Sequence, residues 1–352
     1  MPASKETILP DNAHSTDARI DALSQWLTGA LGTRAFSLAP ASADASFRRY
    51  FRATLDAPYR GTHRTLIVMD APPPRENCAP FVRIAALLAD ARVHAPAIFA
   101  QDLEQGFLLL SDLGTTTYLQ ALDDANAHAL FADALDALVR WQLATRDGAL
   151  PPYDDALLRR ELELFPEWYV GRHLGETLTP AERESLTAMF DRIIAANLAQ
   201  ATVFVHRDFM PRNLMLSTPN PGVLDFQDAV IGPISYDVAC LFKDAFISWP
   251  EERVLDWTIR YWERARRAKL PVPSDFAVFW QDVEWMGLQR HLKVLGIFAR
   301  ILYRDGKPGY IDDAPRFIGY VRPVIERYRE LAPLARLFDR LERRGTVAGY
   351  AF

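Results

Sequence analysis

The segment from Val205 to Ala229, VHRDFMPRNLMLSTPNPGVLDFQDA, places several polar side chains in a run of mostly apolar and turn-forming residues. Asp208 is followed first by Asn213 and then by Asp225. Amide and carboxylate oxygens are hard ligands that suit Mg2+ better than zinc or copper. Phosphoryl transfer needs a metal ion to neutralise developing charge, a carboxylate to orient the attacking hydroxyl, and an in-line geometry. This spacing of oxygen ligands therefore predicts a site for magnesium and phosphates.

Short β runs would bring these side chains together. TVFV (202–205) ends just before His206, and NLML (213–216) and GVLDF (222–226) flank the turn-rich sequence STPNPG. Apolar runs bounded by proline, glycine and asparagine are typical of strands joined by tight turns. We expect a strand, a polar loop and then a hairpin, with Asp225 at the end of the second hairpin strand.

The residues before this segment predict a small mixed α/β lobe. Apolar residues repeat at helical spacing from Ile20 to Leu31, behind possible N-caps at Ser15, Thr16 and Asp17. An amphipathic helix is expected at 80–93. Strand-like segments occupy 47–54, 65–72, 97–103 and 106–113. From Asn126 onward the pattern is mostly helical and includes a long aromatic-rich stretch from Phe276 to Tyr303.

Composition excludes several classes of function. The net charge of −5 provides no positive field for nucleic acid or an anionic membrane surface. The only cysteines, Cys78 and Cys240, are far apart, which argues against a disulfide framework and a zinc site. No apolar run approaches the roughly 18 residues that span a bilayer, and we expect a cytoplasmic protein without an export signal.

The string HRDFMPRN, with Asp208 and Asn213, resembles the catalytic loop of protein kinases and their relatives. Asp225 in LDFQD stands where those proteins have Asp-Phe-Gly, although Gln227 replaces the glycine. The next string, DAVIGPISYDVACL, is unlike a protein-kinase activation segment. It resembles instead the aminoglycoside phosphotransferase and choline kinase-like superfamily, which phosphorylates small molecules.

Within that superfamily, DASFRRYFR, VMDAPP, LLLSDLG and LFPEWYVGRHLG are similar to the bacterial kinases that phosphorylate the anomeric hydroxyl of N-acetylmuramate and N-acetylglucosamine in peptidoglycan recycling. The resemblance implies an α+β, two-lobe protein-kinase-like fold. A small N-terminal nucleotide-binding lobe with an antiparallel sheet would span residues 1–112, and a large, mainly helical lobe for catalysis and substrate binding would span residues 113–352.

The resemblance also implies ATP and Mg2+ as cofactors and assigns roles to individual residues. Asp208 would orient the substrate hydroxyl and accept its proton, and Asn213 and Asp225 would hold Mg2+. His206 and Asp237 would support the catalytic loop. The segment 108–114, which includes Ser111 and Asp112, would be the hinge that meets the adenine.

One family feature is missing. Kinase-like folds carry a lysine on the third strand that pairs with a glutamate on the next helix, whereas this chain has Asp70, or Met69 if the register slips by one. One hypothesis is an exchanged pair of Asp70 with Arg83; an alternative is a phosphate-binding arginine at Arg48 or Arg49. Arg83 could equally lie on the solvent face.

The expected phosphate loop departs from the family pattern as well. The segment APASADAS (39–46) replaces a glycine-rich run. Its small residues permit close approach of the backbone to phosphate, and Ser42 and Ser46 add hydroxyl donors.

The sugar site is expected in the helical lobe, where aromatic faces and polar side chains occur together. We name Trp168 and His291 as candidates, although most tryptophans in such helices serve the core. Asp228 could contact the sugar or cap a turn. A muramate carboxylate would need a cation, for which Arg172, Arg212 and Arg290 are the candidates.

Two other functions stay open at this point. The chain could be another small-molecule kinase of the superfamily, acting on an aminoglycoside, choline or another amino alcohol. It could also be a nucleotide-binding protein without catalysis, which the missing strand lysine favours. Because Asp208, Asn213 and Asp225 all occur, an active kinase of an amino sugar is the prediction.

Overall fold

The computed structural model describes residues 12–43 and 47–348. They divide into two compact units: the described residues up to Ala86 together with Ala95–Gly114, and Leu87–His94 together with the described residues from Thr115. The segment 87–94 belongs with the second unit because Val223 N donates to the His94 carbonyl at 2.7 Å and Arg146 pairs with Asp90 at 2.8 Å.

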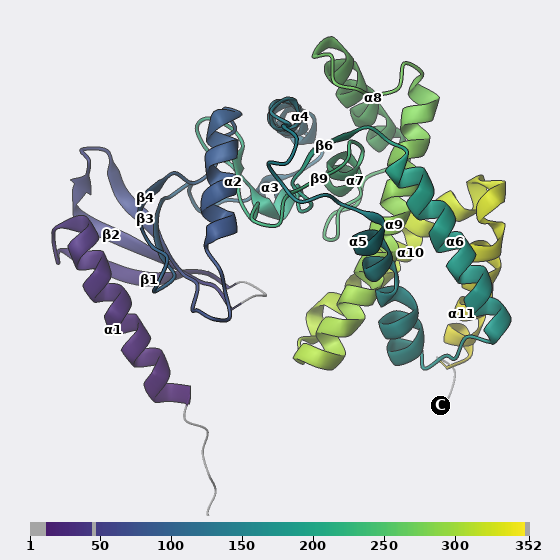
Figure 1. The fold of residues 1–352 in the computed structure, drawn as a ribbon, viewed down its shortest axis with the longest axis horizontal. Helices are drawn as coiled ribbons and strands as arrows, with labels where there is room; N and C mark the ends of the chain where they lie inside the picture. Colours follow the sequence, from purple (N-terminus) through teal and green to yellow (C-terminus); the bar gives the residue numbers. More distant parts are fainter. Residues whose placement is uncertain (1–11, 44–46, 349–352) are drawn as a thin grey trace, which may run out of the picture. The chain divides into compact units, whose positions relative to one another are not determined.

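A five-stranded antiparallel sheet forms the centre of the first unit (Figure 1). The strands are β1 (Phe36–Ala43), β2 (Arg49–Tyr59), β3 (His63–Asp70), β4 (Ile98–Asp102) and β5 (Phe107–Ser111), in the order β1-β2-β3-β5-β4. Arg49 is directly paired with Asp70, and Asp70 with Phe107. Because side chains alternate along a strand, these paired residues share one face of the sheet.

Helix α1 (Asn12–Leu31) packs on that same face. The fully buried Leu23 and Leu27 lie in one core cluster with Leu66, Val68 and Phe107. Burial of a leucine side chain contributes about 2 kcal/mol, so these contacts hold α1 along the sheet (Figure 1). The helix already begins at Asn12, so the predicted N-caps at Ser15, Thr16 and Asp17 are wrong.

Strand β1 was not predicted from the sequence, and its residues 39–43 were expected to belong to the phosphate loop. These residues pair with β2 from Ala39↔Arg52 to Ala43↔Arg49, with a register shift between Pro40 and Ser42. Proline is tolerated in sheets at edge strands and at bulges, and β1 is an edge strand. Because Pro40 is atypical of strands, the sequence did not indicate β1, and the pairing with β2 shows it. Ser46 lies outside the described residues.

The second unit is mainly helical (Figure 1). Its helices are α3 (Tyr118–Ala121), α4 (Ala127–Leu143), α5 (Asp155–Leu162), the π-helix η1 (Phe165–His173), α6 (Pro180–Leu198), η2 (Pro211–Asn213), α7 (Tyr236–Phe242), α8 (Glu251–Arg267), α9 (Phe276–Asp305), η3 (Pro308–Asp313), α10 (Ala314–Arg327), η4 (Arg329–Leu331) and α11 (Ala332–Ala348). Helix α2 (Ala79–Asp90) begins in the first unit and ends in the second. The antiparallel sheet and the helical unit confirm the predicted α+β fold class.

Helix α9 is the central helix of the second unit and packs against α5, η1, α6, α7 and α10. Its residues are buried on several sides, as is usual for a helix inside a core. At Gly296 the approach to η1 is close: a Cβ atom there would lie 2.4 Å from the Leu164 carbonyl oxygen. The glycine lets α9 lie against the segment that follows α5, and α5 and α9 both supply side chains to the site described below.

Two short antiparallel ladders carry the polar loop and the hairpin. Strand β6 (Thr202–Val205) pairs with β9 (Val230–Pro233), and β7 (Leu214–Met215) pairs with β8 (Gly222–Val223). The predicted strand, loop and hairpin are thus confirmed. Among the described helices, none is long and apolar enough to cross a membrane.

Candidate active site

The loop after β6 is held by a buried carboxylate. Asp237, near the start of α7, accepts hydrogen bonds from the backbone N–H groups of His206 at 2.7 Å and Arg207 at 3.0 Å. Asp237 is fully buried, and burial raises its pKa to about 7, against the effect of the two N–H donors. The side chain therefore fixes the backbone just before Asp208; its supporting role in catalysis remains a prediction.

The His206 side chain accepts a hydrogen bond from the backbone of the same loop. The Asp208 N–H donates to His206 Nδ1 at 3.2 Å, which requires a neutral ring with its proton on Nε2. Burial lowers the pKa of His206 from 6.5 to about 4. At neutral pH the imidazole is uncharged, so it acts as a hydrogen-bond acceptor for the loop.

The depressed pKa of His206 predicts a pH-dependent stability. Folding favours the neutral ring, so its contribution is complete above pH 6.5 and is lost as pH falls towards 4. The total loss is about 3 kcal/mol. Urea unfolding between pH 4.5 and 7.5 should show a shallower pH dependence in His206→Asn than in the wild type. Equal slopes in the two proteins would rule out this source.

Asp208 is half-buried, and its backbone makes the contacts that shape the loop. Besides the N–H contact to His206, its carbonyl oxygen accepts from Asn213 Nδ2 at 3.0 Å. Asn213, at the end of η2, also lies 3.4 Å from Asp225 Oδ2 through the same nitrogen. The structure therefore brings together the three residues that the motif predicted for catalysis and metal binding.

Asp225 follows the second hairpin strand in an unusual backbone conformation. Its φ of 61° lies in the left-handed region, which aspartate tolerates better than most residues. Its Oδ1 accepts from Gln227 Nε2 at 2.9 Å. Gln227, which stands where protein kinases have the glycine of Asp-Phe-Gly, thus holds the carboxylate directly, and this role was not predicted.

Asn213 and Asp225 fit a magnesium ion. Asn213 contacts the Asp208 carbonyl and Asp225 through its amide nitrogen, so metal binding would fall to its amide oxygen. Among the described residues no group of three or more His, Cys, Asp or Glu side chains is arranged as a metal site. Mg2+ is commonly bound through one or two protein oxygens together with substrate phosphates and water, which is the donor set that these two residues offer.

A second layer of charged groups lies behind the loop. Glu161 on α5 pairs with Arg207 at 2.6 Å and with Lys293 of α9 at 2.9 Å. Burial raises the pKa of Glu161, but the two cations lower it to about 2. Neither Glu161 nor Lys293 was predicted. Both lie among other charged or polar residues, in RRELELF and RHLKVL, so no sequence pattern singles them out.

In the first unit, the predicted hinge residues are engaged in protein contacts. Asp112 pairs with Arg52 at 2.6 Å and accepts from Gly114 N at 3.0 Å. The side chain of Ser111 accepts from Ala97 N at 2.9 Å. These contacts fix the path of the segment, and its predicted contact with adenine remains a prediction.

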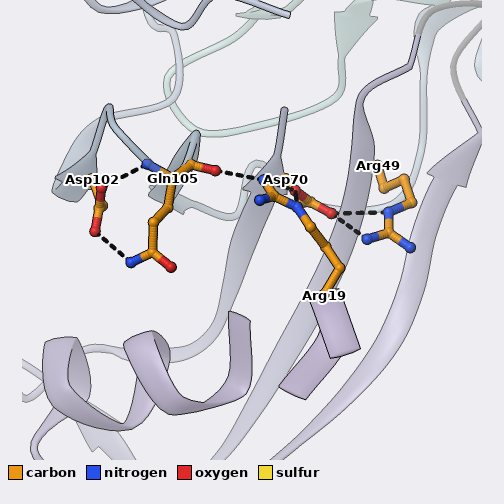
Figure 2. Close-up of polar contacts among 5 residues, drawn as sticks. All are labelled: Arg19, Arg49, Asp70, Asp102 and Gln105. Carbon is orange, nitrogen blue, oxygen red and sulfur yellow. Dashed lines mark hydrogen bonds and ion pairs between the residues drawn. The ribbon is translucent and has the colours of Figure 1, made fainter. Parts of the chain in front are cut away.

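The missing strand lysine has a structural counterpart in a carboxylate with two arginines. Figure 2 shows the fully buried Asp70 between Arg19 of α1 and Arg49 of β2. Arg19 donates through Nε at 2.9 Å and Nη2 at 2.7 Å, and Arg49 donates through Nε at 2.9 Å and also through Nη2. Arg83 is exposed on α2, so the hypothesis of an exchanged Asp70–Arg83 pair is wrong.

Of the other predicted nucleotide residues, Arg48 lies just before β2 and Arg49 at its start. Arg48 is 3.7 Å from Glu76, and Arg49 is held by Asp70 as described. Ser42 lies in β1 opposite Tyr50. Phosphate binding by Ser42, Ser46, Arg48 and Arg49 remains a prediction.

The Asp70 cluster predicts a stability effect. In Asp70→Asn the neutral amide cannot pair with two guanidinium groups, so we expect the free energy of unfolding to fall by about 2 kcal/mol. This is less than for a fully buried ion pair, because both arginines are partly exposed. Urea unfolding measures it. The matched control is Asp102→Asn, because the Asp102 carboxylate binds Gln105 on an exposed turn (Figure 2). This substitution should change the free energy of unfolding little. Equal losses of stability in the two variants would contradict the stabilising role of the Asp70 cluster.

The candidate sugar residues lie on different elements of the second unit. Trp168 is half-buried on η1, and Asp228 is exposed in the turn after β8, where its carbonyl oxygen accepts from Arg207. His291 is fully buried, with ring centroids 5.0 Å from Tyr320 and 5.5 Å from Phe317. This packing favours a core role for His291. Sugar contacts by these residues remain predictions.

The candidate cations differ in their surroundings. Arg172 is exposed on η1. Arg212 belongs to the loop itself, with its guanidinium 4.8 Å from the Phe246 ring centre. Arg290 is buried, donates to the Lys243 carbonyl at 3.4 Å and lies 3.8 Å from Met210 Sδ. Arg212 thus lies within the loop after β6, and Arg290 lies beside it.

Known proteins are similar to this chain over most of its length. A model of the phosphotransferase enzyme family matches residues 37–271. An N-acetylmuramate/N-acetylglucosamine kinase of Pseudomonas putida is 55% identical, over 93% of this chain and 97% of that protein. A kinase of the same name from Pseudomonas aeruginosa is 53% identical, over 93% and 98%.

Solved structures match the fold. The ADP-bound crystal structure of the aminoglycoside phosphotransferase APH(2'')-Ib superposes with a TM-score of 0.56, covering 85% of this chain and 97% of that one. The sequence identity is only 15%, so this likeness concerns the fold alone.

Proposed function

Because the chain belongs to the phosphotransferase enzyme family, we propose that it uses ATP to phosphorylate the anomeric hydroxyl of N-acetylmuramate and N-acetylglucosamine. The observation that carries this proposal is the match, over almost the whole length of each protein, to kinases named for these two sugars. The product would be the α-1-phosphate, and the reaction would serve peptidoglycan recycling in the cytoplasm.

Asp208 would act on the attacking hydroxyl. An anomeric hydroxyl is more acidic than an ordinary alcohol because the ring oxygen withdraws charge, so the carboxylate has less proton-abstracting work. In a loose phosphoryl-transfer transition state its main task is to orient the hydroxyl and to accept the proton late. The contacts of the Asp208 backbone with His206 and Asn213 hold it for this task.

Asn213 and Asp225 would hold Mg2+ beside Asp208. When bound, the metal ion neutralises charge on the phosphates during transfer. Gln227 would keep the Asp225 carboxylate oriented through its hydrogen bond of 2.9 Å. The left-handed backbone at Asp225 is consistent with a functional constraint, because strained residues cluster at active sites.

The test is 31P NMR of the purified protein with Mg-ATP and, in separate samples, N-acetylmuramate, N-acetylglucosamine, choline and kanamycin. The expected result is a new sugar-1-phosphate signal that couples to the anomeric proton. If only choline or kanamycin were phosphorylated, the protein would be a kinase of that acceptor and not of an amino sugar. No turnover with any of the four would favour a non-catalytic nucleotide-binding protein.

A further inference from the structure

Arg207, between His206 and Asp208, has a backbone conformation that an arginine rarely adopts. Its φ is 75°, in the left-handed region that favours glycine. The two residues that flank it are the buried His206 and the proposed catalytic Asp208. The backbone conformation of Arg207 therefore determines the orientation of the next residue, Asp208, and of its carboxylate.

The Arg207 side chain is anchored away from the loop. Nη2 donates to Glu161 Oε1 at 2.6 Å, and the guanidinium carbon lies 5.7 Å from the centre of the Tyr153 ring. Only 19% of the Arg207 side chain and 7% of the Glu161 side chain are exposed. A charge-assisted hydrogen bond that is shielded from water in this way is stronger than one at the surface.

Glu161 is itself fixed by several donors. Its Oε1 is 2.9 Å from Lys293 Nζ, and its Oε2 accepts from Gln289 Nε2 at 3.2 Å and from the Tyr153 hydroxyl. These partners come from α9 and from the segment before α5. The carboxylate is a fixed point on the scaffold rather than a mobile surface acid.

From these contacts we infer that Glu161 is a positioning residue for the reaction: it holds Arg207 in the left-handed conformation and thereby places Asp208. Asp237 fixes the same stretch through the backbone, and Glu161 fixes it through the side chain. Neither group touches the sugar or ATP in this role. The inference rests on the proposed kinase activity, which the wild-type protein must show first.

The first measurement asks whether the left-handed backbone matters. Arg207→Gly and Arg207→Ala both delete the anchored side chain, but only glycine adopts a φ of 75° without a steric penalty. We expect kcat of Arg207→Gly to exceed that of Arg207→Ala by about tenfold, with similar KM values for sugar and ATP. Equal kcat values would overturn the inference.

The second measurement asks whether Glu161 acts through Arg207. Glu161→Gln should lower kcat about tenfold in the wild-type background, with little change in either KM, and should have little further effect in the Arg207→Gly background. An unchanged kcat in Glu161→Gln, or an equal loss in both backgrounds, would overturn the inference. If Glu161→Gln does not fold, Glu161→Asp replaces it. Aspartate keeps the negative charge but is one methylene group shorter, so the carboxylate no longer reaches Arg207. The same changes in kcat are expected in both backgrounds.

The matched control is Glu163→Gln. Glu163 lies two residues further along and also pairs with an arginine, Arg183 at 3.0 Å, but both side chains are nearly half exposed. Its replacement should leave kcat unchanged. Wild-type activity without an effect of Glu161 would refute the positioning role while leaving the proposed function intact.

Discussion

Replacing Asp208 by asparagine is expected to lower kcat about a thousandfold. The neutral amide cannot accept the hydroxyl proton, and it lacks the negative charge with which the carboxylate orients the hydroxyl. The KM values for sugar and ATP should stay within about threefold of the wild type. The loop itself should persist, because the contacts to His206 and Asn213 are made by the backbone of Asp208 rather than by its carboxylate. Steady-state kinetics with Mg-ATP and each sugar provide the measurement.

Asp191→Asn is the control for this prediction. Asp191 is an exposed aspartate on α6 whose carboxylate pairs with Arg159 at 2.8 Å, and its replacement should leave kcat unchanged. A near-normal kcat in Asp208→Asn would exclude Asp208 as the group that acts on the hydroxyl.

The second large effect is expected for Asp237→Ala. The substitution leaves the N–H groups of His206 and Arg207 without their acceptor inside the protein, and an unsatisfied buried donor costs about 1–3 kcal/mol. We expect the free energy of unfolding to fall by about 3 kcal/mol, and kcat to fall about a hundredfold because Asp208 loses its position. Urea unfolding and steady-state kinetics on the same preparation measure both quantities.

Asp237→Asn separates the two roles of this side chain. Its carboxamide oxygen can still accept a hydrogen bond from one of the two N–H groups, whereas its NH2 group, a donor, cannot accept from the other. Its stability and kcat should therefore lie between those of the wild type and Asp237→Ala. Wild-type kcat in Asp237→Ala would show that the catalytic loop does not depend on this carboxylate.

Burial acts in different ways on Asp237 and His206, the two acceptors that hold the loop. It raises the pKa of the carboxylate to about 7 and lowers that of the imidazole to about 4. The neutral imidazole is the form that accepts, so burial favours the role of His206. The Asp237 carboxylate is disfavoured by burial and stabilised by its two N–H donors. The loop is thus held by hydrogen bonds that a solvent-exposed site could not make as firmly.

The sequence alone determined the elements that depend on local periodicity and turn chemistry. The long helix expected from Phe276 to Tyr303 is α9, Phe276–Asp305, because its apolar residues repeat at helical spacing. The hairpin after Asn213 forms because proline and glycine punctuate two short β runs. The order of Asp208, Asn213 and Asp225 along the chain was enough to indicate phosphoryl transfer.

Only the tertiary structure decided which charges meet. Arg207 and Glu161 are 46 residues apart and Arg19 and Asp70 are 51 apart, and no periodicity links such distant positions. Strand β1 needed its neighbour β2, because a proline-containing edge strand has little local signal. The left-handed backbone at Arg207 likewise appears only in the fold, since local sterics disfavour it and contacts from α5 and α7 must hold it in place.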